Sequence, residues 1–360
     1  MSYNYISDIM KKIMSVLKEE NITCGYLYFY IHFVVEVTCF FFLTRISNSP
    51  IVWLVPLIYD AFAFVPQSII GYISDKYPKI KLGLIGVVFL FVGIFIFSFF
   101  NISKYIPLYI ICLGNCLLHV SGAENTLRNS HGKLSHSAIF VSGGSFGVIS
   151  GRLLAKTVIP SWLLLPFILT MIPFLIYTDT FTNKDSNCNK FNYVKPKLNY
   201  GLVIIIAVFV VIIRGFMGYG IPTSWNKTVL QNVLLFTFMG IGKALGGILS
   251  DAYGIRKVGV FSTLLAIPFL CFGDSFMIIS LFGVMAFSMT MSITLGILVS
   301  ILKKSPGLAF GLTTIGLFLG TLPIFFIKTP NILYNSIMIA VLSVLCSILL
   351  AYVLKEDKNV

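Results

Sequence analysis

The sequence predicts an all-α integral membrane protein whose twelve transmembrane helices form two six-helix bundles related by pseudo-symmetry. Three observations lead to this fold class. Of the 360 residues, 57% are hydrophobic and only 11% are charged, whereas about 25% are charged in a typical soluble domain. The apolar residues form continuous runs of about 20, the length at which a helix crosses a ~30 Å hydrocarbon core. A charged pattern also occurs twice, at equivalent positions in the two halves of the chain.

The apolar runs place the spans in order along the chain. We expect them at about 24–44, 51–73, 82–100, 105–127, 136–156, 159–178, 200–220, 228–250, 257–273, 275–302, 306–328 and 331–354. A polar stretch with the composition of a linker separates the sixth span from the seventh. The predicted organisation is therefore an N-terminal segment over 1–23, bundles over 24–179 and 200–354, a cytoplasmic linker over 180–199 and a tail over 355–360.

The N-terminal segment has the pattern of an amphipathic helix and not that of a cleavable signal peptide. Its apolar residues recur at helical spacing with lysines between them: Ile6, Ile9, Met10, Ile13 and Leu17, with Lys11, Lys12 and Lys18. We expect this helix to lie on the inner membrane surface.

The net charge of +13 is explained by membrane topology, so we expect no nucleic-acid partner. With the N-terminus inside, the cytoplasmic segments carry most of the 26 Lys and Arg residues, and the opposite loops carry only Arg45, Lys104, Lys156, Lys227 and Lys328. Segments rich in Lys and Arg stay on the cytoplasmic side. Both termini are therefore expected in the cytoplasm, and the chain in the cytoplasmic membrane.

The repeated charged pattern reads GYISDKYPKI from Gly71 and GGILSDAYGIRK from Gly246. Aligning the two copies pairs Gly71 with Gly247 and Asp75 with Asp251. Each copy falls between the second and third predicted spans of its own half. This correspondence predicts parallel repeats related by an axis along the membrane normal.

The two copies resemble the loop signature of the major facilitator superfamily, roughly Gly-x-x-x-Asp-Arg-x-Gly-Arg-Lys. They match it at Gly71, Asp75, Lys76 and Lys79, with Pro78 at a usual glycine, and at Gly247, Asp251, Gly254 and Arg256, with Ala252 at a usually basic position. The resemblance implies secondary transport by alternating access. It also implies that Asp75, with Lys76 and Lys79 as partners, holds loop and helix ends together in the outward-facing state. Asp251 with Arg256 is expected to do the same in the second half.

Two further stretches are similar to the fosmidomycin-resistance-type exporters of that superfamily. HFVVEVTCFF, from His32, is similar to their first-helix pattern of a His followed four residues later by an acid. GNCLLHVSGAENTLR places His119 on their Phe-His-Pro-Glu stretch, although Val120 and Ser121 replace its proline and acid. Arg152 stands where the fifth-helix antiporter motif usually has proline. This resemblance implies efflux by an antiporter.

Ionisable residues inside the predicted spans are functional candidates, because each costs about 2.5–3.5 kcal/mol to insert at a helix centre. They are His32, Glu36, Asp60, His119, Glu124, Arg152, Arg214 and Lys243. None lies within spans 3, 6, 9 or 12, which face lipid in the arrangement that the resemblance implies.

Proton coupling is assigned to Glu36, His32 and Asp60. Because His32 and Glu36 are four residues apart, they share a helix face, and a buried carboxylate beside an imidazole can load and release a proton. Glu36 is the expected proton carrier, with His32 tuning it; the alternative is a hydrogen-bonded pair that only stabilises the bundle. Asp60 requires a partner on another helix, for coupling or as a buried polar contact.

The substrate cavity is assigned His119, Glu124, Arg214, Lys243 and Arg152. The embedded acids lie in the first half, whereas Arg214 and Lys243 lie in the second, as suits an anionic substrate held by the bases. Direct ion pairs between helices would explain this distribution of charges equally well. Glu124 could instead pair with Arg128, His119 could be a packing residue, and Arg152 could reach the outer interface by snorkelling.

The sequence therefore predicts a secondary active transporter of a small organic solute, acting as a monomer with protons and the lipid bilayer as its partners. We expect no enzyme, cofactor or metal site, because neither a P-loop nor a zinc-ligand spacing such as HExxH is present. His131 and His136 are interpreted as residues of a solvated loop. Two alternatives stay open: a solute uptake symporter, and a non-transporting receptor or assembly protein on the same fold.

Overall fold

The computed structural model describes residues 11–18, 22–47, 54–182, 188–326 and 332–356. Within these residues the regular secondary structure is helical, apart from one isolated β-bridge between Val194 and Leu354. The predicted segments 1–23, 180–199 and 355–360 each lie partly outside the described residues.

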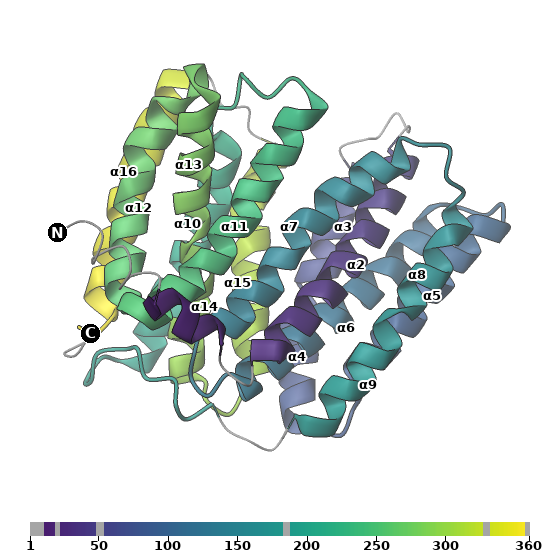
Figure 1. The fold of residues 1–360 in the computed structure, drawn as a ribbon, viewed down its shortest axis with the longest axis horizontal. Helices are drawn as coiled ribbons and strands as arrows, with labels where there is room; N and C mark the ends of the chain where they lie inside the picture. Colours follow the sequence, from purple (N-terminus) through teal and green to yellow (C-terminus); the bar gives the residue numbers. More distant parts are fainter. Residues whose placement is uncertain (1–10, 19–21, 48–53, 183–187, 327–331, 357–360) are drawn as a thin grey trace.

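The first half contains six spans (Figure 1). They are α2 (Ile22–Ile46), α3 (Leu54–Phe64) continued by α4 (Gln67–Lys76), α5 (Leu82–Phe99), α6 (Tyr105–Asn129), α7 (Ser135–Ala155), and the sixth built from η1 (Ser161–Leu163), α8 (Leu164–Leu169) and α9 (Met171–Phe181). The break between α3 and α4 falls at Pro66, whose ring removes a backbone donor from the helix.

The second half also contains six spans. They are α10 (Tyr200–Gly220), α11 (Val229–Tyr253), α12 (Ile255–Cys271), α13 (Met277–Ser288) continued by α14 (Thr290–Ile301), α15 (Pro306–Thr321) continued by η3 (Leu322–Phe325), and α16 (Ile332–Val353), with the short turn η2 (Gly273–Ser275) after α12. Gly254 separates α11 from α12 with φ of 96°, a conformation that favours glycine.

The predicted twelve-helix architecture is confirmed. Eleven helices within the described residues are long and apolar enough to cross a membrane. The remaining span is α12, which has 17 residues and packs against α13 and α16. All twelve lie within a few residues of the ranges that the hydrophobic runs predict.

The two halves pack against each other mainly through two helix pairs: α7 on α11, and α4 on α15. Figure 1 shows the first half on the right, in purple to teal, and the second half on the left, in green to yellow. The visible linker residues join the second half, where the Cys188 N–H donates to the Lys303 carbonyl at 2.8 Å and the Lys195 N–H to the Val353 carbonyl at 3.0 Å. We call this end of the molecule the linker side.

The described N-terminal turns, residues 11–18, contact both halves of the protein. Val16 is only 5% exposed and packs with Ile139 of α7 and Ile248 of α11. Part of the apolar face therefore covers the seam between the halves on the linker side. Helical spacing identifies an apolar face, but a protein seam and a membrane surface satisfy that face equally well.

Candidate functional site

A cavity of about 500 Å³ lies between the two halves. Its walls are mostly apolar and aromatic, and five of the predicted candidates line it: His32, Glu36, His119, Arg214 and Lys243. The cavity extends away from the linker side, because its lining includes Tyr219, Ile221 and Thr223 at the distant end of α10. One chamber thus contains the ionisable residues of both halves.

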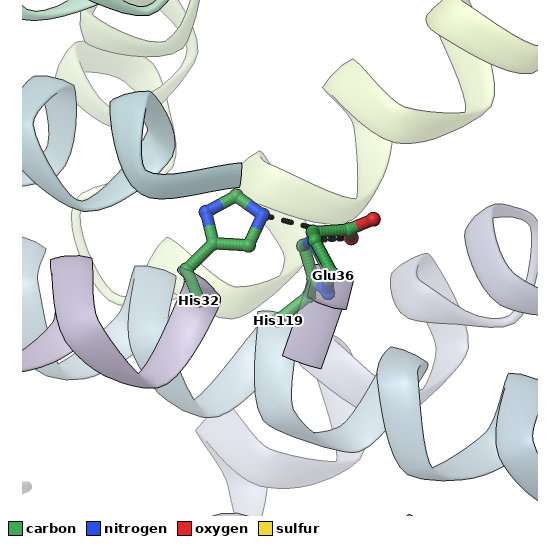
Figure 2. Close-up of side chains that lie close together, drawn as sticks. All are labelled: His32, Glu36 and His119. Atoms are coloured by element: carbon green, nitrogen blue, oxygen red, sulfur yellow. Dashed lines mark ion pairs between the residues drawn. The ribbon is translucent and has the colours of Figure 1, made fainter. Parts of the chain in front are cut away.

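The wall formed by the first half contains a compact cluster of His32, Glu36 and His119, drawn in Figure 2. The Glu36 Oε1 atom lies 3.3 Å from His119 Nε2 and 3.7 Å from His32 Nε2. All three residues are buried. His32 and Glu36 come from one face of α2, as their spacing predicts, and α6 brings His119 to the same point. We call these residues the His–Glu–His cluster.

Backbone carbonyl groups orient both imidazole rings. His32 Nδ1 lies 2.9 Å from the Phe140 carbonyl oxygen, and His119 Nδ1 lies 3.0 Å from that of Asn115. Because a carbonyl oxygen only accepts hydrogen bonds, each Nδ1 must carry the hydrogen. In a neutral ring the Nε2 atom then presents a lone pair towards Glu36.

Asn115 fixes the carboxylate of the cluster. Its Nδ2 atom donates to Glu36 Oε1 at 3.1 Å and also lies 2.9 Å from the Tyr59 hydroxyl. Asn115 and Tyr59 are not among the site residues that the sequence predicts. The signal for Asn115 was its place four residues before His119, on the same face of the same helix.

Glycines of α7 make room for the cluster. A Cβ atom at Gly144 would overlap the His32 ring, and one at Gly147 would lie 2.7 Å from Glu36 Cβ. Because glycine alone has no Cβ, α7 can pack closely on α2 here.

The wall formed by the second half contributes two cations, Arg214 of α10 and Lys243 of α11. Arg214 donates to the Phe287 carbonyl oxygen at 2.7 Å, and its guanidinium lies 5.0 Å from the centre of the Phe287 ring. Among the described residues, no carboxylate forms an ion pair with Arg214 or Lys243. The alternative of direct ion pairs between helices is therefore not observed for these two bases.

Three other candidates lie outside the lining of the cavity. Glu124 forms an ion pair with Arg128 at 2.9 Å and accepts a hydrogen bond from Ser74, so its cavity assignment gives way to the ion-pair alternative. Arg152 lies between two aromatic rings that line the cavity, 5.1 Å from the centre of Phe40 and 5.4 Å from that of Phe236.

Asp60 corrects another expectation. No hydrogen bond or ion pair to its carboxylate is found in the part of the chain that the structure describes, so the expected partner on another helix is not there. Its side chain is only partly buried within the protein.

The first charged pattern, whose Gly71 and Asp75 lie in α4, binds a helix of the opposite half. Asp75 accepts hydrogen bonds from the backbone N–H groups of Gly307 at 3.1 Å and Leu308 at 2.9 Å, and lies 3.2 Å from an Arg128 guanidinium nitrogen. These amides form the N-terminus of α15, which attracts negative charge. Gly71 permits the contact, because a Cβ there would overlap the Gly307 backbone.

The second charged loop repeats this arrangement in the opposite direction. Asp251 accepts from the N–H groups of Leu134 at 2.9 Å and Ser135 at 2.8 Å, at the N-terminus of α7. A Cβ at Gly247 would overlap the Ala138 side chain. Each half therefore binds a helix N-terminus of the other, and we call these two contacts the reciprocal latch.

The partners predicted for these acids are wrong. Neither Lys76 nor Lys79 contacts Asp75 in the described structure, and the Lys76 ammonium lies over the Tyr77 ring, 5.6 Å from its centre. Arg256 pairs with Glu356 and not with Asp251. The reason is geometric: the basic residues of both loops face solvent, whereas the acids point into the seam between the halves.

Comparisons with known proteins show the fold. No family model and no curated protein matches the sequence. Among solved structures, the Escherichia coli fucose:proton symporter FucP is 12% identical, with a TM-score of 0.61, over 92% of this chain and 98% of that one. FucP in the outward conformation is 13% identical with a TM-score of 0.63, over the same shares of the two chains. The human organic anion transporter MFSD10 is 11% identical with a TM-score of 0.56, over 92% of this chain and all of that one.

These likenesses show that the chain has the major facilitator fold. Each half contains six spans and one copy of the charged pattern, between its second and third spans. At identities of 11–13%, the shared feature is the fold, and the activity has to be argued from the site.

Proposed function

We propose that this protein is a proton-coupled secondary transporter that moves a small organic anion across the cytoplasmic membrane by alternating access. One observation carries the proposal: a single cavity has the His–Glu–His cluster on one wall, and Arg214 and Lys243, without carboxylate partners among the described residues, on the other. Solved structures with this fold include a fucose:proton symporter and an organic anion transporter, which supports the same class of activity.

The geometry of the cluster supports proton binding. With both Nδ1 hydrogens donated to carbonyl oxygens, two Nε2 lone pairs and the Glu36 carboxylate face one another. Asn115 donates one hydrogen bond to Glu36, but it donates none to the two imidazole Nε2 atoms. A proton bound between the Glu36 carboxylate and an Nε2 atom replaces the repulsion between their lone pairs with a charge-assisted hydrogen bond. Glu36 is the proposed proton carrier, and the two histidines share its proton.

The opposite wall supports an anionic substrate. A buried cation without a counter-charge is costly in a membrane interior, and a carboxylate, phosphate or sulfonate between Arg214 and Lys243 offsets that cost. The planar guanidinium suits bidentate binding, whereas the ammonium acts as a point charge. The aromatic walls suit an organic body on the anion.

Charge also bears on the direction of coupling. A proton on the cluster adds one positive charge to the wall facing Lys243, so protonation favours anion binding and the anion favours protonation. Binding that is mutually favourable suits symport. Under an inward proton gradient, symport gives uptake, which is the solute uptake alternative named in the sequence analysis above.

Efflux by antiport, which the resemblance to exporters implies, is the second candidate. It requires proton binding and anion binding to be mutually unfavourable. The two candidates therefore differ in the sign of the coupling between the two ligands.

Vesicle transport tests the proposal and separates the candidates. The purified protein is reconstituted and an acid-outside gradient is imposed with a panel of mono- and dicarboxylates, organic phosphates, sulfonates and neutral analogues. A symporter accumulates at least one anion, whereas an antiporter exports a preloaded one. If no solute moves faster than through empty vesicles while the protein is folded, the transport proposal is wrong and a receptor on this fold is favoured.

A further inference from the structure

The His–Glu–His cluster has the ligand types of a transition-metal site. His32, Glu36 and His119 each offer one ligand atom, and these atoms lie within 4.8 Å of one another. Two imidazoles and one carboxylate form the ligand set of several zinc enzymes, with a further position left open. The same set also occurs in the facial triads that bind iron.

The spacing of the ligand atoms is close to that of an assembled site. At bond lengths of about 2.0–2.1 Å and tetrahedral angles, two zinc ligands lie about 3.3–3.4 Å apart. The distance from Glu36 Oε1 to His119 Nε2 is 3.3 Å, and that to His32 Nε2 is 3.7 Å. Closing the second distance requires His32 Nε2 to move a few tenths of an ångström towards Glu36 Oε1. The two Nε2 atoms lie within 4.8 Å of each other and have to reach the same spacing when an ion binds.

The surroundings orient these ligands for binding a cation. Ligating histidines almost always donate their other ring N–H to a carbonyl or a carboxylate, which fixes the tautomer. Here the Phe140 and Asn115 carbonyl oxygens receive the two Nδ1 hydrogens, and Asn115 Nδ2 holds the Glu36 carboxylate. Both Nε2 atoms therefore have a lone pair free to bind an ion beside Glu36.

We propose that His32, Glu36 and His119 bind one divalent transition-metal ion of the Zn²⁺ class, with an open coordination position that faces the cavity. Mg²⁺ and Ca²⁺ are disfavoured because they require six or more oxygen ligands. The open position faces the cavity because all three residues line it. There a water molecule or the carboxylate of a bound anion completes the coordination.

The metal ion and the proton occupy the same place. Zn²⁺ needs both Nε2 lone pairs and the ionised carboxylate, so the ion excludes the proton that Glu36 carries in the proposed transport cycle. Zn²⁺ therefore inhibits proton-driven transport. This last statement rests on the proposed function, whereas metal binding itself does not.

Binding is tested on the purified full-length protein with Zn²⁺ by calorimetry and with Co²⁺ by visible absorption. We expect one ion per chain, with Kd raised at least about tenfold in His32→Gln, His119→Gln and Glu36→Gln. His131→Gln is the matched control, because His131 is exposed on a loop and should leave binding unchanged. Wild-type protein that binds no ion, or equal affinity in the cluster variants, would overturn the proposal.

A second measurement needs no variant and so does not depend on their folding. X-ray absorption of the Zn²⁺-loaded wild-type protein should show two imidazole nitrogens at about 2.0–2.1 Å, and a spectrum with no imidazole ligand contradicts the site. Transport separates the two proposals. Proton-driven transport without metal binding contradicts only the metal-site proposal. Metal binding without any proton-driven transport contradicts only the proposed function.

Discussion

The Asp75 carboxylate accepts a hydrogen bond from the backbone N–H of Leu308 at 2.9 Å, across the boundary between the two halves. The equivalent contact joins Asp251 to the Ser135 N–H at 2.8 Å. Both contacts lie on the linker side, while the cavity extends towards the other end of the bundle. The structure is therefore closed on the linker side, and opening that side requires both contacts to break.

Replacing Asp75 with asparagine should favour opening of the linker side. The substitution removes the negative charge at the α15 N-terminus, a loss of about 1–2 kcal/mol, which corresponds to about a 5- to 30-fold shift in the equilibrium. Cys188 reports this shift because it is buried close to Asp75 and Arg128. Maleimide labelling of Cys188, followed by peptide mass spectrometry, should accelerate by a similar factor.

The pH dependence of this labelling has a defined sign. Burial raises the pKa of the Cys188 thiol to about 12, so at pH 8 the closed form reacts on the order of 10³-fold more slowly than a free thiol. The labelling rate should rise with pH as the thiolate fraction grows.

Asp274→Asn is the control for Asp75→Asn: Asp274 also accepts a backbone hydrogen bond, from Ser224 at 2.8 Å, but within the second half. Equal rates in the two variants would contradict the role of the latch.

Much of the fold could be predicted from the sequence because membrane insertion leaves a strong local signal. Each span is a continuous apolar run, and the repeated loop orders the spans into halves. The packing of Val16 against Ile248 was not predictable, because these residues meet only after the two halves have packed.

The site was predictable only where its contacts are local. The pair His32 and Glu36 follows from helical spacing, as does the ion pair of Glu124 with Arg128. His119 joins the cluster from another helix, and the partners of Asp75 include backbone N–H groups. A backbone amide leaves no side-chain signature, so a loop motif alone could not indicate it.

A methyl group at Gly144 should disturb the cluster. In Gly144→Ala the new Cβ overlaps the His32 ring, so the ring or α7 has to move and the alignment with Glu36 is lost. We expect at least a tenfold loss of proton-driven transport rate, since misplacement of a site by about 1 Å can cost about 100-fold. Gly218→Ala is the matched control, because Gly218 also lines the cavity and its added Cβ meets only Phe287, at 3.7 Å. Equal transport by the two variants would argue against the packing role of Gly144.

Neutralising the two cavity cations should weaken anion binding. Arg214→Gln and Lys243→Gln each remove one charged hydrogen-bond donor, a loss of about 1.5–3 kcal/mol, so KM for the transported anion should rise about 10- to 100-fold. Lys227→Gln, on an exposed loop, should leave KM unchanged. Concentration-dependent uptake of the labelled anion measures the effect. An unchanged KM in both cavity variants would remove the assignment of an anionic substrate.

Paired proton and anion fluxes in vesicles containing wild type, Glu36→Gln or Asp274→Asn test the central claim most directly. Wild type and Asp274→Asn should move the anion against its concentration under a pH gradient, with a matching proton flux. Glu36→Gln should lose driven accumulation but keep counterflow exchange, because glutamine preserves the shape of the site without its ionisable proton. If Glu36→Gln drives accumulation as well as wild type does, the proton carrier is not Glu36 and the account is contradicted.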